Sequence, residues 1–338
     1  MGVLSMKSST WVCIFPSSIQ ELLSKLPEPI LDRIEEVRVR QERPLELNYA
    51  GQFHYVSRRG VLTDVPHEGY RPTREDGNRL LDFITNHSLY TMEEELRKGY
   101  ITIQGGHRIG LAGRAVLTKG HVDHLRDITS FNIRIAREMQ GVGDSIIPYL
   151  LDFRHQTVNH TLIVSPPQHG KTTLIRDLAR LMSTGQWRHP EAKWKGLKVG
   201  VVDERSEIAG CMKGVPSFDV GPRTDVLDGC PKAEGMMMMI RSMSPDVMLV
   251  DEIGRPEDAE AIREALHAGI RVIATAHGGE LEDVLRRPVL NKLMSDELFQ
   301  SYVVLRRSGR GMSRRFYDAR RRLLHPDGLA MKGGGMDG

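Results

Sequence analysis

The sequence has few cysteines and no long apolar run. Its three cysteines, Cys13, Cys211 and Cys230, are too widely spaced for a disulfide framework or a zinc site. No apolar stretch approaches the ~20 residues that a membrane-spanning helix needs. Met1–Pro16 also lacks the apolar core and cleavage site of a secretory leader. Hydrophobic residues still make up 40% of the 338 residues, which excludes a disordered chain. The composition predicts a protein of a reducing compartment with about two domains.

A large excess of one charge is also missing. The formal net charge is +3, but residues 306–338 hold eight arginines and one lysine against three aspartates, a balance of +6. Residues 1–305 therefore carry −3. An acidic body with a basic end does not describe a nucleic-acid-binding surface, so we do not expect nucleic acid as a partner. The arginine-rich end is a candidate docking edge or a solvated tail.

The first 150 residues have the mixed pattern of a small α+β domain with its linker. Periodicity and end signals predict helices over Ser18–Leu26, Thr73–Asn86, Met92–Lys98 and, as the connection to the next domain, Asp144–Asp152. Alternation predicts strands at Val37–Val39, Leu45–Leu47, Phe53–Val56, Tyr100–Gln104 and Arg108–Leu117, the last two joined by a Gly105-Gly106 turn.

Continuous apolar strands separated by helices begin after residue 158. The four runs are Leu162–Val164, Val199–Val202, Val247–Val250 and Ile270–Ala274. This pattern is typical of a parallel sheet covered by helices on both faces. We predict an α/β domain with a mainly parallel sheet over residues 151–318, closed by a hairpin of Tyr302–Arg307 with Arg314–Tyr317. Residues 319–338 are predicted to form a disordered, glycine-rich tail.

The first apolar run leads directly into a phosphate-binding motif, composed of Ser165, Pro166, Pro167, Gln168, His169, Gly170, Lys171, Thr172 and Thr173. Its ending and its position between a strand and an amphipathic helix match a P-loop, where backbone amides at a helix N-terminus surround phosphate oxygens. Lys171 is predicted to reach the β- and γ-phosphates and Thr172 to ligate Mg²⁺, so ATP and Mg²⁺ are the expected cofactors. Ser165 replaces the first glycine of the motif, and the prolines have no N–H. The donors must therefore come from Gln168 to Thr172; the alternative is an ordinary strand-to-helix turn.

Acidic residues follow two of the other apolar strands. Asp251 and Glu252 match a Walker B element, in which Asp251 would hold Mg²⁺ through water and Glu252 would act as general base. The alternative is a helix N-cap. Asp203, Glu204 and Glu207 would reach the same edge of a parallel sheet and are candidates for positioning water, against the alternative of a loop salt bridge with Arg205.

Two further features are open to more than one interpretation. Thr275 or His277, at the end of the fourth run, would sense a γ-phosphate by hydrogen bonding, or His277 is a solvated turn residue. The Met236–Met239 run in a predicted helix over Lys232–Met243 is either core packing or part of a groove for a partner or a membrane. Core packing is favoured because methionine fills irregular core space.

These elements, in this order, resemble the RecA-like P-loop ATPases of the secretion and type IV pilus superfamily. Longer strings from about residue 95 to 305, including Val201–Cys211, Asp225–Gly235 and Leu249–Asp258, resemble the stage III sporulation protein AA family of endospore-forming bacteria. The resemblance implies an ATPase that powers a secretion-like channel between mother cell and forespore. It also implies a ring, usually of six copies, on the cytoplasmic face of a membrane, bound there by membrane-embedded sporulation channel proteins.

The same resemblance implies that an arginine reaches the active site of a neighbouring subunit from the N-terminal domain or linker. Arg126, Arg134 and Arg137 are the preferred candidates, because they flank the domain junction; Arg223 is a further one. Surface solvation is the alternative for each arginine. Two other functions stay open: a nucleic-acid-associated P-loop ATPase, and a regulatory module that binds ATP with little turnover.

Overall fold

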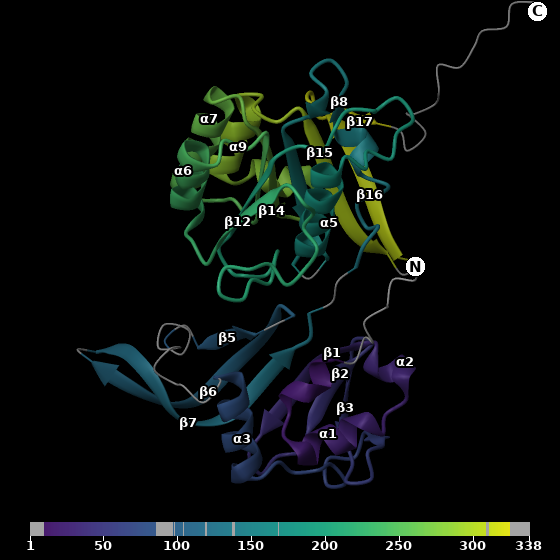
Figure 1. Ribbon diagram of the computed structural model, residues 1–338, viewed down its shortest axis with the longest axis vertical. Helices are drawn as coiled ribbons and strands as arrows, with labels where there is room; N and C mark the ends of the chain where they lie inside the picture. Colours follow the sequence, from purple (N-terminus) through teal and green to yellow (C-terminus); the bar gives the residue numbers. More distant parts are fainter. Residues whose placement is uncertain are drawn as a thin grey trace, which may run out of the picture. The chain divides into compact units, whose positions relative to one another are not determined.

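The computed structural model describes residues 10–85, 97, 99–103, 105–118, 120–136, 139–167, 169–308 and 311–324. The chain divides into two compact units, residues 1–137 with 210–212, and residues 138–209 with 213–338 (Figure 1). The second unit begins before residue 151, because Ile146, Ile147 and Leu150 are fully buried in its core. The predicted helix over 144–152 is wrong. Pro148 lies in a single 3₁₀ turn, η3 (Ile147–Leu150), and the chain then enters the short strand β8 (Leu151–Asp152), which pairs with β9 (Thr157–Val158).

The first unit is built on a seven-stranded antiparallel sheet in the order β4-β3-β2-β1-β7-β6-β5. The strands are β1 (Ile34–Arg40), β2 (Glu46–Tyr49), β3 (Gln52–Val56), β4 (Leu62–Thr63), β5 (Tyr100–Ile103), β6 (His107–Thr118) and β7 (His121–Arg134). The predicted strands and the β5–β6 hairpin are confirmed.

Short helices accompany this sheet: η1 (Thr10–Ile14), α1 (Ser17–Ser24), α2 (Glu28–Leu31) and α3 (Arg74–Ile84). Thr73 and Asp76 form a reciprocal capping box that fixes the start of α3. The predicted helix over 92–98 lies outside the described residues, apart from Arg97, and so do Asn86 and Gln104.

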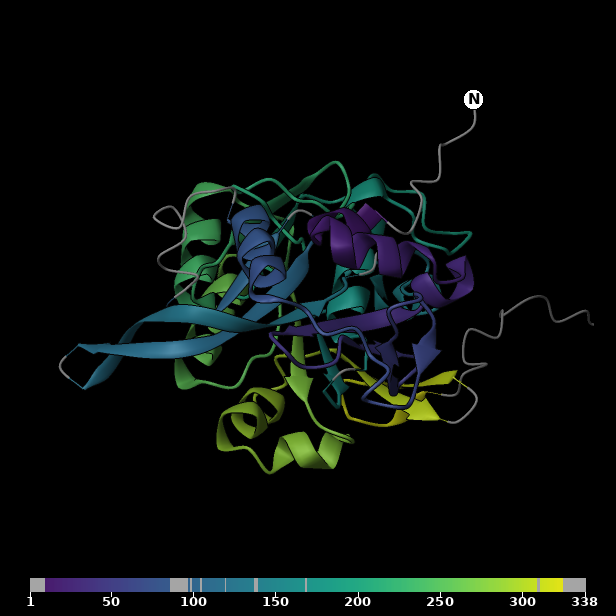
Figure 2. The ribbon, with the colours of Figure 1, turned by 90° about the horizontal axis from the view of Figure 1, so that it is seen from below.

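The longest strand of the first unit, β7, was not predicted. Beyond Gly113 and Asp127, β6 and β7 continue as a two-stranded ribbon (Figure 2), most of whose residues are exposed or only partly buried. The alternation of apolar and polar residues that marks a half-buried strand is therefore missing there. A Cβ on Gly113 would lie 2.6 Å from the Arg126 carbonyl oxygen, so the register shift at this point requires glycine.

The second unit is built on an eight-stranded sheet in the order β12-β11-β13-β14-β10-β15-β16-β17. The first six strands in this order are parallel to one another. β16 pairs antiparallel with β15, and β17 pairs antiparallel with β16. The bounds are β10 (Thr161–Ser165), β11 (Val199–Asp203), β12 (Thr224–Asp228), β13 (Val247–Val250), β14 (Arg271–His277), β15 (Ser301–Ser308), β16 (Gly311–Asp318) and β17 (Leu323–Leu324).

All four predicted parallel strands and the β15–β16 hairpin are confirmed. Two features were not predicted: the edge strand β12, whose residues are not fully buried, and the parallel pairing of β15 with β10. Residues 319–324 form a turn and β17, where a disordered tail was predicted from 319; residues 325–338 lie outside the described part.

Helices cover both faces of this sheet (Figure 1). Alternate β10 side chains point to opposite faces: Ile163 packs with α5 (Lys171–Thr184), and Leu162 and Val164 pack with α6 (Lys232–Ser242), α7 (Pro256–His267) and α9 (Pro288–Ser295). The short helix α8 (Leu281–Leu285) joins the second layer.

The methionine run of α6 divides between core and surface. Met236 and Met239 are buried in the core, as the core-packing interpretation expected. Met237 and Met238 instead line a groove of about 960 Å³ between α6 and α7. None of the helices in the described part of the chain is long and apolar enough to cross a membrane.

Candidate nucleotide-binding site

Parallel register brings the motifs of the second unit to one edge of the sheet. Ser165, the last residue of β10, lies opposite His277, the last residue of β14. Val250, the last residue of β13, lies opposite Ala274 of β14. The carboxyl ends of parallel strands are where α/β sheets bind ligands, so the phosphate-binding motif and the acids after β13 share one candidate site.

The turn after β10 presents a helix N-terminus. Gly170 has φ 77°, a left-handed conformation that glycine adopts without strain, and α5 begins at the next residue. No side chain among the described residues caps this helix end, and the first-turn amides of a helix have no acceptor within it. Those amides are the kind of donor that binds phosphate. Gln168 lies outside the described residues.

Ser165, which replaces the first glycine of the motif, fits without strain because it is an extended strand residue. It is fully buried, and its hydroxyl donates to the Pro166 carbonyl at 3.1 Å. Its own carbonyl accepts hydrogen bonds from Lys171 Nζ at 3.1 Å and from the Gly278 amide at 3.3 Å. The turn is thereby tied to both the P-loop lysine and the segment after β14.

Lys171 is buried, with 7% of its surface exposed, and its Nζ lies 2.5 Å from His277 Nδ1. Burial lowers the pKa of Lys171, while Asp251 and Glu252 act in the opposite direction. An ammonium group can only donate, so His277 Nδ1 is the acceptor in this contact.

His277 links the lysine to the acid after β13. Its Nε2 lies 2.7 Å from Glu252 Oε1, and Arg205 Nη1 lies 3.2 Å from Glu252 Oε2. Lys171, His277, Glu252 and Arg205 thus form one continuous chain of polar contacts. Glu252 also has φ 53°, a strained value for a residue with a side chain and one that is found at functional sites.

Thr275 is hydrogen-bonded to both acids that follow β13. It is fully buried, its hydroxyl accepts the Glu252 amide at 2.8 Å, and the same hydroxyl donates to Asp251 Oδ1. Of the two residues predicted at this strand end, Thr275 contacts the acids after β13, and His277 contacts both Lys171 and Glu252. Sequence reasoning missed the role of Thr275, because no motif marks a hydroxyl whose partners lie on the neighbouring strand.

The structure does not bring Glu204 into this group. Its carboxylate pairs with Lys232 Nζ at 2.7 Å, at the start of α6. Asp203 is buried and accepts the amides of Glu207, Ile208 and Ala209, so it shapes its own loop. Burial raises the pKa of Asp203 to about 6, although the three amides favour its charged form. Arg205 pairs with Glu252 and not with the acids of its own loop, contrary to the alternative raised from the sequence.

The three preferred arginine candidates belong to the first unit, whereas Arg223 belongs to the second, where its guanidinium donates to the Gly196 carbonyl. Arg134 lies at the end of β7, 3.8 Å from Glu36. Arg126 lies directly opposite Arg114 on the β6–β7 ribbon. Arg137 lies outside the described residues.

The donor set suits a magnesium nucleotide better than a protein-bound metal cluster. Among the described residues, no group of three or more His, Cys, Asp or Glu side chains could hold a metal ion. Magnesium in nucleotide sites is held by one or two protein oxygens together with phosphates and water. Thr172, in the first turn of α5, and Asp251 are residues of that kind.

Solved structures define the class of this fold. The Legionella pneumophila ATPase DotB matches with a TM-score of 0.54 and 14% identity, over 85% of this chain and 77% of that one. The pilus retraction motor PilT, solved with bound ADP, matches with a TM-score of 0.54 and 16% identity, over 84% of this chain and 78% of that one. The protein therefore has the fold of the secretion and pilus ATPases, as the motif order predicted.

Sequence comparison then gives the family. The model of the family described as sporulation stage III, protein AA matches residues 7–324. Stage III sporulation protein AA of Bacillus subtilis (strain 168) is 51% identical over 306 residues, which cover 90% of this chain and 93% of that protein. The chain belongs to the stage III sporulation protein AA family, and the similarity includes the N-terminal region.

Proposed function

We propose that this protein is a Mg²⁺-dependent ATP hydrolase that works as a ring-forming motor of a secretion-like complex during endospore formation. The observation that carries the proposal is the contact chain from Lys171 through His277 to Glu252 at the carboxyl edge of the parallel sheet. It joins a phosphate-binding lysine to a carboxylate that can activate water. In this proposal ATP and Mg²⁺ are bound by the motif from Ser165 to Thr173 together with Asp251.

Each residue then has a defined task. Lys171 holds the β- and γ-phosphates, the Thr172 hydroxyl and Asp251 hold Mg²⁺, and Glu252 takes the proton of the attacking water. His277 reports the γ-phosphate, because that phosphate competes for the Lys171 ammonium that His277 contacts. For Glu204, whose carboxylate is paired with Lys232, the water-positioning role requires that this ion pair open.

Steady-state ATP hydrolysis tests the assignment. Lys171→Ala and Glu252→Gln are each expected to lower kcat by about 100-fold or more. Lys198→Ala and Glu191→Gln are the matched controls, because Lys198 precedes β11 at the opposite edge of the sheet and Glu191 is exposed. If the protein hydrolyses ATP and neither test substitution changes the rate, the catalytic assignment is wrong.

Charge on the β6–β7 ribbon supports an arginine that acts across a subunit boundary. Arg114 and Arg126 are exposed and directly opposite each other, and neither has an ion pair within the described part of the chain. Like charges in that position are destabilising unless an anion lies between or beside them. Arg126 is therefore our first candidate for the residue that reaches a neighbour's phosphates, ahead of Arg134, which has Glu36 nearby.

Subunit mixing tests this part. Arg126→Gln and Lys171→Ala rings are each expected to be inactive, but a mixed ring contains interfaces with one intact arginine and one intact P-loop. Partial recovery of activity on mixing is the expected result, and it should appear only at concentrations where the protein assembles. The same mixing with Arg134→Gln and Arg137→Gln ranks the three candidates. A fully active monomer would eliminate the arrangement.

Recruitment to a membrane-embedded channel protein, on its cytoplasmic side, completes the proposal. Its support is membership of the sporulation family and the resemblance to secretion motors. Co-purification of the protein with membranes that contain the channel proteins, and its loss when they are absent, is the expected outcome.

A further inference from the structure

Both carboxylate oxygens of Glu252 are engaged in this structure. His277 Nε2 lies 2.7 Å from Oε1, and Arg205 Nη1 lies 3.2 Å from Oε2. A general base must offer an oxygen to the proton it removes. Each oxygen can accept a second hydrogen bond, but a carboxylate paired with a guanidinium is a weaker base, so Glu252 removes a proton from water more readily once one of these two partners leaves.

Arg205 is the partner that is free to leave. It lies in the loop after β11, whose backbone is held by the buried Asp203 carboxylate through three amides. Ser206, the next residue, has φ 55°. The Arg205 side chain is 54% exposed, so it can move while the loop backbone stays in place.

Arg205 is linked to the P-loop lysine through Glu252 and His277. Arg205 and Arg287 both lie close enough to Lys171 to disfavour its protonated form. A guanidinium group matches phosphate geometry and binds it through two parallel hydrogen bonds. Arg205 should therefore bind a terminal phosphate held by Lys171 more strongly than it binds one carboxylate oxygen of Glu252.

We propose that Arg205 moves from Glu252 to the terminal phosphate of bound ATP, so that the phosphate which is to be cleaved also frees the oxygen needed to activate water. The inference rests on the proposed ATPase function and assigns a task to a residue for which the motifs provide none. ADP has no γ-phosphate, so with ADP the Arg205–Glu252 pair stays closed. Arg205 then distinguishes ATP from ADP within one subunit.

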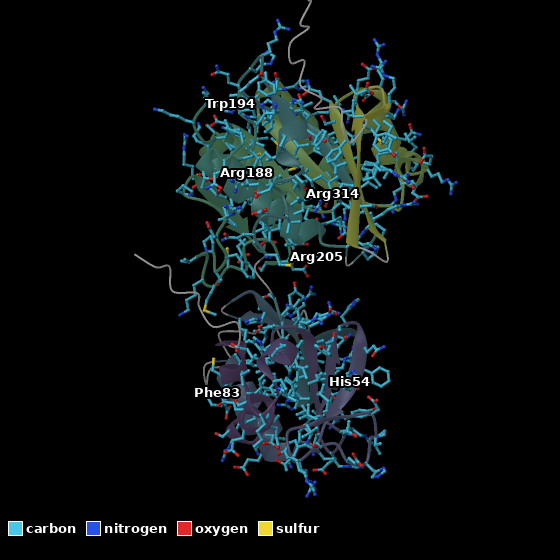
Figure 3. All side chains as sticks on the ribbon, turned by 90° about the vertical axis from the view of Figure 1, so that its right-hand side faces the viewer. His54, Phe83, Arg188, Trp194, Arg205 and Arg314 are labelled. Atoms are coloured by element: carbon cyan, nitrogen blue, oxygen red, sulfur yellow. The ribbon has the colours of Figure 1, made fainter. Side chains whose placement is uncertain are left out.

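Calorimetric binding of Mg²⁺–ADP and of the Mg²⁺ complex of a non-hydrolysable imido analogue of ATP tests the proposal. Arg205→Gln is expected to weaken the analogue by about tenfold, the loss of one charge-assisted contact, and to leave ADP affinity unchanged. Arg205→Lys keeps the charge and should recover part of the loss. The control is Arg188→Gln, which removes a comparable exposed arginine paired with Asp144 at 2.9 Å, elsewhere on the second unit (Figure 3).

A second pair of variants tests the link to Glu252. Glu252→Gln releases Arg205 and should tighten analogue binding more in the presence of Arg205 than in the Arg205→Gln background. Equal weakening of ADP and analogue by Arg205→Gln would mean that the residue only supports its loop, and no weakening would mean that it does not move to the phosphate. Either result overturns the inference and leaves the ATPase proposal standing. If the unmodified protein binds neither nucleotide, both proposals fail.

Discussion

Thr275 offers the sharpest test of the site, because one buried hydroxyl holds both acids that follow β13. The change is Thr275→Val, which keeps the shape of the side chain and removes the hydroxyl. The Glu252 amide then loses its acceptor at 2.8 Å, and Asp251 loses a donor. With Thr275 fully buried, water cannot replace the hydroxyl from the core side.

The magnitude follows from these two hydrogen bonds. A hydrogen bond to a charged group contributes about 1.5–3 kcal/mol, and a buried amide left unpaired costs about 1–3 kcal/mol. Because the Glu252 amide is only partly buried, we expect Thr275→Val to lower the free energy of unfolding by about 2–3 kcal/mol. Thr275→Ser keeps the hydroxyl and removes one methyl group, which costs about 1 kcal/mol. Urea unfolding of the two variants measures the difference.

The same pair separates positioning from phosphate contact. If Thr275 only positions the acids, Thr275→Val lowers kcat by about 100-fold through misplaced Glu252, while ADP and ATP-analogue affinities stay unchanged. Thr275→Ser should keep most of kcat. Weaker analogue binding with unchanged kcat would instead show that Thr275 touches the γ-phosphate. Equal stability and activity of the Val and Ser variants would refute the structural argument altogether.

Three further predictions concern stability. Burial lowers the pKa of His107 to about 4, below the ordinary 6.5, so the unfolded chain binds more protons between these values. His107 should therefore lower the free energy of unfolding by about 2 kcal/mol from pH 7 to pH 5. His107→Gln should reduce the fall measured in urea titrations by that amount and leave the part contributed by His160, whose pKa burial also lowers to about 4. Asp177→Ala removes the carboxylate that the buried Arg180 now contacts at 2.7 Å, and should lower the free energy of unfolding by about 3–5 kcal/mol. Replacing both residues with apolar ones should recover most of that loss in urea titrations. Gly196→Ala would place a Cβ 2.1 Å from a backbone oxygen of Ser183, so the thermal midpoint should drop; an unchanged midpoint would mean that this close approach does not exist.

The fold could be predicted wherever burial left a pattern in the sequence. β10 and β13 are buried along their whole length and read as continuous apolar runs. β7 and β12 were missed for the opposite reason: no residue in the ribbon part of β7 is fully buried, and β12 is an edge strand with no fully buried residue. The pairing of β15 with β10 was missed because no local signal specifies which strand a distant segment will join.

The site could be predicted to the level of strand ends and no further. That the P-loop and the Asp251-Glu252 pair share one edge follows from parallel strands alone. The partners within the edge do not, because Lys171 and His277 are 106 residues apart and meet only through the register of β10 with β14. A salt bridge of Arg205 with an acid of its own loop was one of two alternatives left open, whereas Arg205 pairs with Glu252 and Glu204 pairs with Lys232.

The contacts of Lys171 show what a nucleotide must displace. A buried ammonium group without partners would be costly, and here the Ser165 carbonyl and His277 satisfy it. A phosphate therefore gains only the difference between its own bonds and these. A single weak anion gains little from this exchange. A triphosphate replaces both contacts of Lys171 and also binds the first-turn amides of α5. In the proposed mechanism, a phosphate that binds Lys171 releases His277, which contacts Glu252, so occupancy of the P-loop reaches the proposed general base through these two contacts.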